Sequence, residues 1–497
     1  MQYISTRGKT APVSCAQAIK QGLADDGGLF MPETIPTLSK EEITMLCDLP
    51  YDRRAAFILG KFLTDYTTAE LEADCAVAYG ADRFPGGAAP VVTLDAENKL
   101  SLLELWHGPT CAFKDMALQI MPRLLTRALA KTGEKRTALI LVATSGDTGK
   151  AALEGYRDVE GVKIMVFYPA HGVSAIQKLQ MATQAGENVF VQSVEGNFDD
   201  AQNGVKRIFS DAAAAAEMNE QGIFFSSANS INWGRLAPQI AYYVSAYCDL
   251  VTSGKLALGE VMDVCVPTGN FGNIFAAYIA KRMGLPIGKF ICASNQNNVL
   301  TDFLATGTYD RRRNFYTTIS PSMDILISSN LERLLYLVAG SERTADYMAR
   351  LAKDGTYTVD ADVLAAIKAD FVGYDCDEAA TAEAMRDTYR RLGYTADPHT
   401  AVAIGAANKA RAKEGAAREM VVVSTASPYK FAVDVCKVHE IAYADDFSAF
   451  ATLHDASRME IPASLAVLRS RAIRFSPEAA IDPMEMYTAV KTFAKSN

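Results

Sequence analysis

Between about residue 91 and residue 300, short β-rich runs alternate with helical stretches, and this alternation constrains the fold more than any other feature. The runs lie at 137–143, 163–168, 188–194, 261–266 and 289–293 and are bounded by glycine, serine and asparagine loops. Strands separated by helices form βαβ units, whose parallel sheets are buried on both faces. A further apolar run at 419–424 is expected to complete the same sheet. The pattern predicts an open α/β fold that binds ligands at the carboxyl ends of its strands.

Helical periodicity divides the rest of the chain of 497 residues, which is long enough for two or three domains. Residues 1–90 are expected to form a small, mostly helical unit that ends at a Gly/Pro-rich seam. The α/β core is predicted over 91–435, with a helix-rich insertion at 305–415. Residues 436–497 are predicted to be a helical extension, and the sequence does not indicate its role.

Composition argues against several classes of protein. The net charge is −9 and the acidic residues are dispersed, so the chain shows no basic footprint for nucleic acid. No apolar stretch approaches the roughly 18 residues that cross a bilayer, and residues 1–7 lack the apolar region of a secretory signal. The nine cysteines and five histidines are scattered, which argues against a metal site and suits a reducing compartment. We therefore expect a cytoplasmic protein without metal. Because long amphipathic helices such as those between 330 and 415 are more often core than subunit interface, we also expect a monomer, with a dimer as the alternative.

Lys114 lies in unusually apolar company for a lysine. It ends the sequence HGPTCAFK at 107–114, between an apolar run and an amphipathic helix, with Trp106 and Phe113 close by. A partly desolvated amine has a lowered pKa and becomes a nucleophile, as a lysine that forms a Schiff base must be. A solvated surface lysine is the ordinary alternative, so this segment does not decide the matter alone.

Two loops between a strand and a helix offer backbone N–H groups to an anion. The loop ATSGDTG at 143–149 precedes a predicted helix, although an ordinary capped turn would look the same. It is not a nucleotide-binding P-loop, because Thr144 replaces a required glycine and Ala151 provides no Mg²⁺ ligand. The loop PTGNFGN at 267–273 has two glycines three apart, which allow close approach to a phosphate.

A third loop, STASP at 424–428, places hydroxyl groups at the end of a strand. A hydroxyl can hydrogen-bond a ring nitrogen without charging it. A nucleophilic amine, a phosphate cradle and such a hydroxyl are the partners that the aldehyde, phosphate and ring nitrogen of pyridoxal 5′-phosphate require. The sequence therefore predicts this cofactor.

The same motifs resemble those of the threonine synthase family of bacterial and fungal type. They run in order along the chain: YISTR at 3–7, GLADDGGLF at 22–30, HGPTCAFKD at 107–115, SGDTG at 145–149, SANSIN at 227–232, GNFGN at 269–273, DPH at 397–399 and STASP at 424–428. The resemblance implies the tryptophan-synthase-β-like fold of pyridoxal-phosphate enzymes, with parallel or mixed sheets flanked by helices. It also implies two subdomains with the cofactor in the cleft between them, preceded by the helical N-terminal domain of the family.

Carried over position by position, the resemblance implies a role for each matching residue. Lys114 would bind the cofactor as a Schiff base, and Thr425 would face its ring nitrogen. The cofactor phosphate would be held by Gly269, Asn270, Phe271, Gly272 and Asn273. Substrate-binding residues would be Thr110, Ser145, Gly146, Asp147, Thr148, Asn232 and Arg235, the last two as candidates for the substrate phosphate. Asn273 and Ser427 stand where the family often has Asp and His, which affects fine tuning and not the class.

The reaction implied by the resemblance converts O-phospho-L-homoserine and water to L-threonine and phosphate, the last step of threonine biosynthesis. Lys114 would act as the catalytic base at Cα once the substrate amine has displaced it. A related dehydratase-type lyase is the nearest alternative, but such enzymes usually carry Ser-Gly-Asn-His where this chain has Ser-Gly-Asp-Thr at 145–148. A non-catalytic relative would be expected to lose the lysine or the cradle, and both are intact.

Overall fold

The first part of the chain combines a small sheet with four helices. The computed structural model describes residues 1–415 and 417–495. The helices are α1 (Cys15–Gln21), α2 (Lys40–Cys47), α3 (Tyr51–Phe62) and α4 (Thr68–Tyr79). The sequence did not predict the antiparallel sheet β2–β1–β3, formed by β1 (Gln2–Ser5), β2 (Val13–Ser14) and β3 (Phe30–Pro32). Such short strands are specified by pairing between distant segments, which local periodicity does not reveal.

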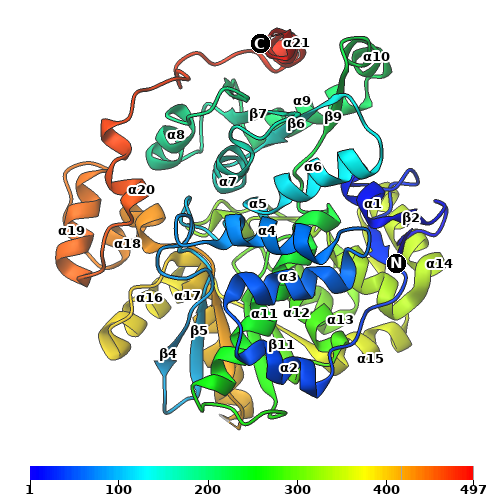
Figure 1. The fold of residues 1–497 in the computed structure, drawn as a ribbon. Helices are drawn as coiled ribbons and strands as arrows, with labels where there is room; N and C mark the ends of the chain where they lie inside the picture. The colour runs from blue at the N-terminus through cyan, green and yellow to red at the C-terminus, as the bar shows by residue number, and fades with distance from the viewer. Residues whose placement is uncertain (416, 496–497) are drawn as a thin grey trace.

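The strands of the α/β region form two sheets, so the expectation of a single sheet is wrong. The larger sheet has six strands in the order β14–β11–β10–β15–β5–β4, and the smaller has four in the order β8–β7–β6–β9. All neighbours are parallel except β4 and β5. Alternation of strands and helices identifies the strands but not their partners. Figure 1 shows the smaller sheet above the larger sheet and its helices, together with α7 (Asp147–Tyr156), α8 (Ala175–Ala182), α9 (Phe198–Ser210) and α10 (Ala212–Glu220).

The six predicted strands of this region are all present. They correspond to β6 (Thr137–Ala143), β7 (Val162–Pro169), β8 (Val189–Val194), β10 (Met262–Pro267), β11 (Ile287–Ser294) and β15 (Met420–Ser424). The strands β4 (Val91–Asp95), β5 (Leu100–Glu104), β9 (Ile223–Ser226) and β14 (Phe371–Asp375) complete the two sheets. Every residue of β10 and β15 is buried, as expected for parallel strands covered on both faces.

Helices cover both faces of the larger sheet. The central helix α11 (Trp233–Thr252) is almost completely buried and packs on α3 and on α12 (Gly272–Met283). On β10, β11 and β15 packs α17 (Pro398–Glu414). The region 305–415 also contains α14 (Leu331–Asp354), α15 (Ala361–Asp370) and α16 (Glu378–Leu392). Its strand β14 adds an edge to the larger sheet beside β11.

The C-terminal segment completes the smaller sheet. After α19 (Ser448–Ser457) the chain runs to α21 (Met486–Lys495), the red helix at the top of Figure 1. On the way, Ile481 forms a parallel bridge with Val194 at the edge strand β8. Val490 and Phe493 of α21 then join the buried cluster that contains Leu139 and Met165. None of the helices in the described part of the chain is both long and apolar enough to cross a membrane.

Candidate active site

Three adjacent strands of the larger sheet lead into the predicted cofactor-binding segments. β10, β15 and β5 are neighbours and parallel, with Cys265, Val422 and Leu102 in one row. The chain leaves β10 at the loop that contains Gly269, leaves β15 at Thr425, and reaches Lys114 a short distance beyond β5. The loop Ser145–Gly149 follows β6 of the smaller sheet. The carboxyl ends of parallel strands in an open sheet are where α/β folds bind ligands.

Backbone bonds tie the Lys114 segment to the end of β15. The Phe113 N–H donates to the Thr425 carbonyl over 2.8 Å, and Ala112 forms a bridge with Ala426. The Ser427 N–H donates to the Cys111 carbonyl over 3.0 Å. Lys114 itself opens the single helical turn α5 (Asp115–Leu118). Thus the amine and the strand-end hydroxyl, far apart in sequence, are held on one backbone framework.

The Lys114 amine is desolvated and lies beside a carboxylate. Its side chain is 10 % exposed, its Nζ donates to Ser322 Oγ over 2.9 Å, and it lies 3.7 Å from Asp147 Oδ2. Burial lowers the pKa of Lys114 to about 8, and the attraction of Asp147 only partly opposes this. A fraction of this amine is therefore neutral near physiological pH, as a nucleophile or base requires.

Lys430 is a second buried lysine at this site, and sequence reasoning missed it. Its Nζ lies 2.9 Å from Asp147 Oδ1 and donates to the Thr110 carbonyl over 2.9 Å. Asp147 Oδ1 also accepts from Gln177 Nε2 over 2.8 Å. Burial alone would raise the pKa of Asp147, but the charges of Lys430 and Lys114 hold that pKa well below its ordinary value. The only signal in the sequence was the apolar setting of Lys430, in PYKFAV at 428–433.

The loop Ser145–Gly149 presents backbone amides at the start of α7 (Asp147–Tyr156). Gly146 has φ of +143°, and a Cβ there would lie 2.5 Å from the Gln177 side chain. Thr144 Oγ1 accepts the N–H groups of Gly146 and Gly149 over 3.0 and 2.9 Å. The N–H groups of Asp147 and Thr148, in the first turn of α7, have no acceptor within the helix. The loop can therefore bind an anion through its backbone, while the Asp147 carboxylate is engaged by lysines.

The loop Gly269–Asn273 is fixed through its carbonyl groups. Ser328 Oγ donates to the Gly269 carbonyl over 2.7 Å, and two groups of Asn330 donate to the Asn270 carbonyl over 3.0 Å. Because a trans peptide places N–H opposite C=O, the amides of this turn point to the other side. Phe271 has φ of +60° and precedes α12, so these amides lie at the start of that helix. This arrangement suits a phosphate group.

Side chains in this second loop turn away from the cradle. Asn273 Oδ1 accepts the hydroxyls of Tyr242 and Tyr243, each over 2.5 Å, so this side chain points into the core. The Phe271 ring packs against Phe371. Phe271 and Gly272 can therefore contribute backbone amides only, whereas Asn273 also has a buried Nδ2 group without a hydrogen-bond partner.

Two of the predicted substrate-binding side chains, those of Thr110 and Asn232, form hydrogen bonds within the fold. The Thr110 hydroxyl donates to Asp115 Oδ1 over 2.8 Å. Asn232 caps α11 by accepting the Gly234 N–H over 2.8 Å, and its Nδ2 donates to the Ile19 carbonyl. Both side chains are thus occupied within the fold.

Arg235 is buried without a counter-ion. Its Nη1 donates to the Ala228 carbonyl over 2.7 Å, and its Nε has no hydrogen-bond partner. No carboxylate of the described residues lies within 4 Å, and burial lowers the pKa of Arg235 to about 10. The charge of Arg235 also contributes to the lowered pKa of Lys114, so both face the same region. A buried, unpaired guanidinium is a strong candidate for binding an anionic group.

A histidine that sequence reasoning gave no role holds the Ser322 turn in place. His399 Nε2 accepts the Ser322 N–H over 3.1 Å, and its Nδ1 pairs with Asp397 Oδ1 at 2.8 Å. The turn also covers Gly269, where a Cβ would lie 2.6 Å from the Ser322 carbonyl oxygen. In the sequence, the DPH motif at 397–399 is the signal for this pair.

Comparisons with known proteins agree with this architecture. Residues 2–79 match the family model "Threonine synthase N terminus", and residues 84–427 match "Pyridoxal-phosphate dependent enzyme". Threonine synthase of Pseudomonas aeruginosa is 38 % identical over 87 % of this chain and 89 % of that protein. Threonine synthase-like 1 of Homo sapiens is 42 % identical over 88 % of this chain, but over 61 % of its own length. The chain thus spans about three fifths of the first curated relatives that it matches.

A solved structure extends the likeness to the whole fold. Pyridoxal-phosphate-bound threonine synthase from Brucella melitensis superposes with a TM-score of 0.88 and 35 % identity, covering 100 % of both chains. This likeness confirms the predicted fold class, with its two sheets flanked by helices, and supports the predicted cofactor. The chain belongs to the threonine synthase family of pyridoxal-phosphate-dependent enzymes.

Proposed function

We propose that this protein is a threonine synthase, which converts O-phospho-L-homoserine and water to L-threonine and phosphate. The observation that carries the proposal is the Lys114 amine, buried beside Asp147 with its pKa lowered to about 8. It lies where the loops after three adjacent parallel strands approach one another. The threonine synthases among the relatives of this chain support the same conclusion.

The residues present fit pyridoxal phosphate. Lys114 offers the amine that binds it, and the amides of Asn270 to Asn273 at the start of α12 offer a phosphate site. Thr425, at the end of β15, offers a hydroxyl to the ring nitrogen. Bound there, the cofactor withdraws electrons from the substrate carbons, which no protein side chain can do as well.

Two anchors would orient the substrate. The amides of Asp147 and Thr148 would hold its carboxylate, and the pairing of the Asp147 side chain with Lys430 limits repulsion there. Arg235 would bind the substrate phosphate and stabilise it as it leaves. Because the polar atoms of Asn232 are occupied, we assign it to positioning the start of α11, on which Arg235 lies.

Lys114 would also move the protons at Cα. With substrate bound, the neutral amine of Lys114 would remove the proton at Cα and later return it to that carbon. The lowered pKa makes that neutral form available without a strongly basic medium. The Ser322 hydroxyl, 2.9 Å from Nζ, would hold the amine in position between these steps.

A product assay tests this function directly. The protein is incubated with O-phospho-L-homoserine, and phosphate, threonine and 2-oxobutyrate are measured. Equal amounts of phosphate and threonine are expected. Phosphate accompanied by 2-oxobutyrate would instead identify a dehydratase-type lyase, and a protein that binds no cofactor would be a non-catalytic relative.

The organisation of the chain is proposed on similar grounds. We assign residues 1–90 to the N-terminal domain, 91–435 to the catalytic core and 436–497 to the extension, supported by the matches at 2–79 and 84–427. A monomer is supported by the inward packing of apolar residues such as Leu334, Leu335 and Met385 of α14 and α16. A cytoplasmic location is supported by the nine free cysteine thiols. Light scattering and fractionation of cells test the last two assignments.

A further inference from the structure

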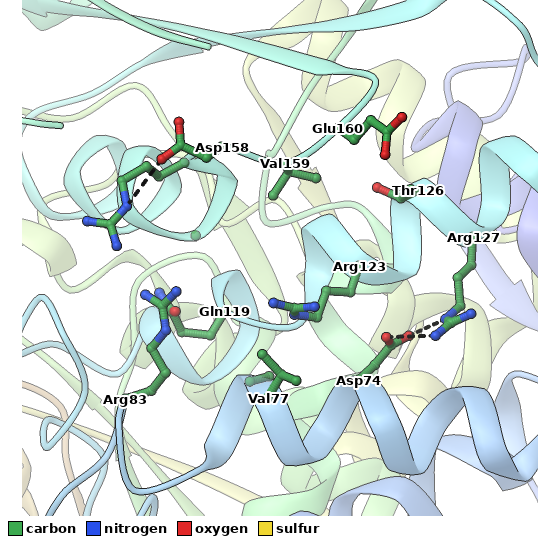
Figure 2. Close-up of a pocket in the computed structure, with 13 residues that line it drawn as sticks. Asp74, Val77, Arg83, Gln119, Arg123, Thr126, Arg127, Asp158, Val159 and Glu160 are labelled. Atoms are coloured by element: carbon green, nitrogen blue, oxygen red, sulfur yellow. Dashed lines mark hydrogen bonds and ion pairs between the residues drawn. The ribbon is translucent and has the colours of Figure 1, made fainter. Parts of the chain in front are cut away.

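A basic pocket lies between the N-terminal helices and the start of the catalytic core, and it shares no residue with the candidate active site. Its volume is about 400 Å³, within the range of small-ligand sites. The pocket is bounded by α4, by α6 (Met121–Lys131) and by the turn that follows α7. Figure 2 shows side chains of its lining, with Asp74 paired to Arg127. Four arginines and three carboxylates contribute to that lining: Arg83, Arg123, Arg127, Arg157, Asp74, Asp158 and Glu160.

Arg123 is the cation of this pocket without a counter-ion. Among the residues that the structure describes, no carboxylate lies within ion-pair distance of it, and Figure 2 draws no interaction to its guanidinium. Arg127 engages Asp74 over 2.5 and 3.0 Å. Burial lowers the pKa of Arg123; the charge of Asp74 partly opposes this, and the charges of Arg83 and Arg127 add to it. A cation held among like charges creates a local positive potential that attracts an anion.

Gln119 provides a second, independent sign of an absent ligand. Its side chain is 5 % exposed and lines the pocket, and its Nε2 is buried without a hydrogen-bond partner. A buried amide N–H without an acceptor costs about 1–3 kcal/mol, so such groups are normally satisfied. An acceptor oxygen supplied by a ligand would remove that cost.

The positions of the arginines and carboxylates indicate which class of ligand fits the pocket. Arg83, Arg123 and Arg157 come from three different segments. Arg83 and Arg157 both contact Glu154, at 3.6 and 3.0 Å, and Arg157 also lies 3.9 Å from Asp158. Planar guanidinium groups bind phosphate oxygens in pairs. The exposed Asp158 and Glu160 on the outer turn would repel an extended polyanion such as a nucleic acid. The pocket therefore suits a compact anion.

We propose that this pocket binds a small phosphorylated metabolite, with Arg123 as its principal contact and Gln119 as a donor from the floor. The site is distinct from the one that binds substrate and does not depend on the proposed function. It would join α4 of the N-terminal domain to α6 and the end of α7 in the core.

Calorimetric titration of the holoenzyme with inorganic pyrophosphate tests this proposal. The wild-type protein should bind pyrophosphate, and Arg123→Gln should weaken that binding at least about tenfold, as expected for loss of a charged hydrogen bond. Arg53→Gln is the matched control, because Arg53 pairs with Glu72 on the surface and does not line the pocket. Arg235→Gln should also retain the binding. Equal affinity of Arg123→Gln and wild type, or loss of binding in Arg235→Gln, would overturn the proposal.

A second variant guards against a folding defect in Arg123→Gln. Val77 lines the pocket and is 49 % exposed, so Val77→Glu adds a negative charge without disturbing the core. It should weaken pyrophosphate binding at least about threefold at low salt and less at high salt, because salt screens exposed charges. Unchanged affinity in Val77→Glu, or no binding to the wild type at all, would refute the pocket assignment.

Discussion

The Lys430 ammonium group lies 2.9 Å from one oxygen of Asp147, and the other oxygen of Asp147 lies 3.7 Å from the Lys114 amine. One buried carboxylate thus stands between two lysines. The positive charge of Lys430 offsets part of the negative charge of Asp147, so Asp147 attracts a proton on Lys114 less strongly. Lys430 also repels the positive charge of a protonated Lys114 directly. Both effects favour the neutral amine, in addition to the larger effect of burial. We assign Lys430 to positioning Asp147 and to keeping the pKa of Lys114 low.

Replacing Lys430 by Met should therefore shift the pH profile. Without its charge, Asp147 acts on Lys114 alone, and the pKa of Lys114 rises. The acidic limb of kcat should move up by about one pH unit, so activity at pH 7 falls about tenfold and recovers at higher pH. A purely structural role would lower kcat equally at every pH. The control is Lys437→Met. Lys437 is exposed and lies on the next helix along the chain, so its replacement should leave the pH profile of kcat unchanged.

Arg235→Gln should impair substrate binding and leave the fold intact. The loss of a charged contact with the substrate phosphate should lower kcat/KM at least about a hundredfold. Because Arg235 has no carboxylate partner in the described part of the chain, the melting temperature should not fall. The matched control is Arg54→Gln, which removes a buried guanidinium that pairs with the half-buried Asp249 at 2.5 Å, and it should lower the melting temperature. A large loss of stability in Arg235→Gln would contradict its assignment.

Gly269→Ala should weaken cofactor binding. The added Cβ would lie 2.6 Å from the Ser322 carbonyl oxygen, so the loop or the Ser322 turn must move. We expect the dissociation constant for pyridoxal phosphate to rise at least about tenfold. The clash would displace the backbone amides of the loop, and displaced amides form weaker hydrogen bonds to the phosphate. Gly60→Ala serves as control, because a Cβ there meets only Leu71 at 3.7 Å. Titration of the visible absorption of the bound cofactor measures both, and an unchanged constant would refute the proposed cradle.

Val490→Asp should show that the C-terminal helix is part of the fold. Val490 is 0 % exposed and packs in the cluster with Leu139 and Met165 of the smaller sheet. A buried, unpaired carboxylate there should cost about 3 kcal/mol or more in the free energy of unfolding. Thr492→Asp, on the exposed side of the same helix, should cost little. Equal melting temperatures of the two variants would show that α21 is dispensable for the smaller sheet.

The sequence predicted those parts of the site that are contiguous. Lys114, the Ser145 loop and the Gly269 loop each lie within one short motif between a strand and a helix. Such a motif shows both the chemistry of its residues and their place in the fold. Lys430 and His399 could not be assigned roles in this way, because their partners Asp147 and Ser322 are distant in sequence. The hydrogen bond of Asn232 could not be predicted for the same reason, because its partner Ile19 belongs to the distant N-terminal helices.

The sequence did not predict the division of the strands into two sheets, for a related reason. Periodicity identified β6 and β10 equally well, but strand order depends on contacts between distant segments. The same holds for Ile481. It pairs with Val194, which is distant in the sequence, so no local pattern indicates the contact. Local patterns therefore gave the elements and the motifs, and tertiary packing decided how they meet.

We propose two roles for Lys114, which would bind the cofactor and also move the Cα proton. Lys114→Ala and the control Lys437→Ala are purified with pyridoxal phosphate, and their visible absorption and their release of threonine from O-phospho-L-homoserine are measured. Lys114→Ala should lose the visible band of covalently bound cofactor and all measurable threonine formation, while Lys437→Ala keeps both. Threonine formation by Lys114→Ala at the rate of the control would contradict the account.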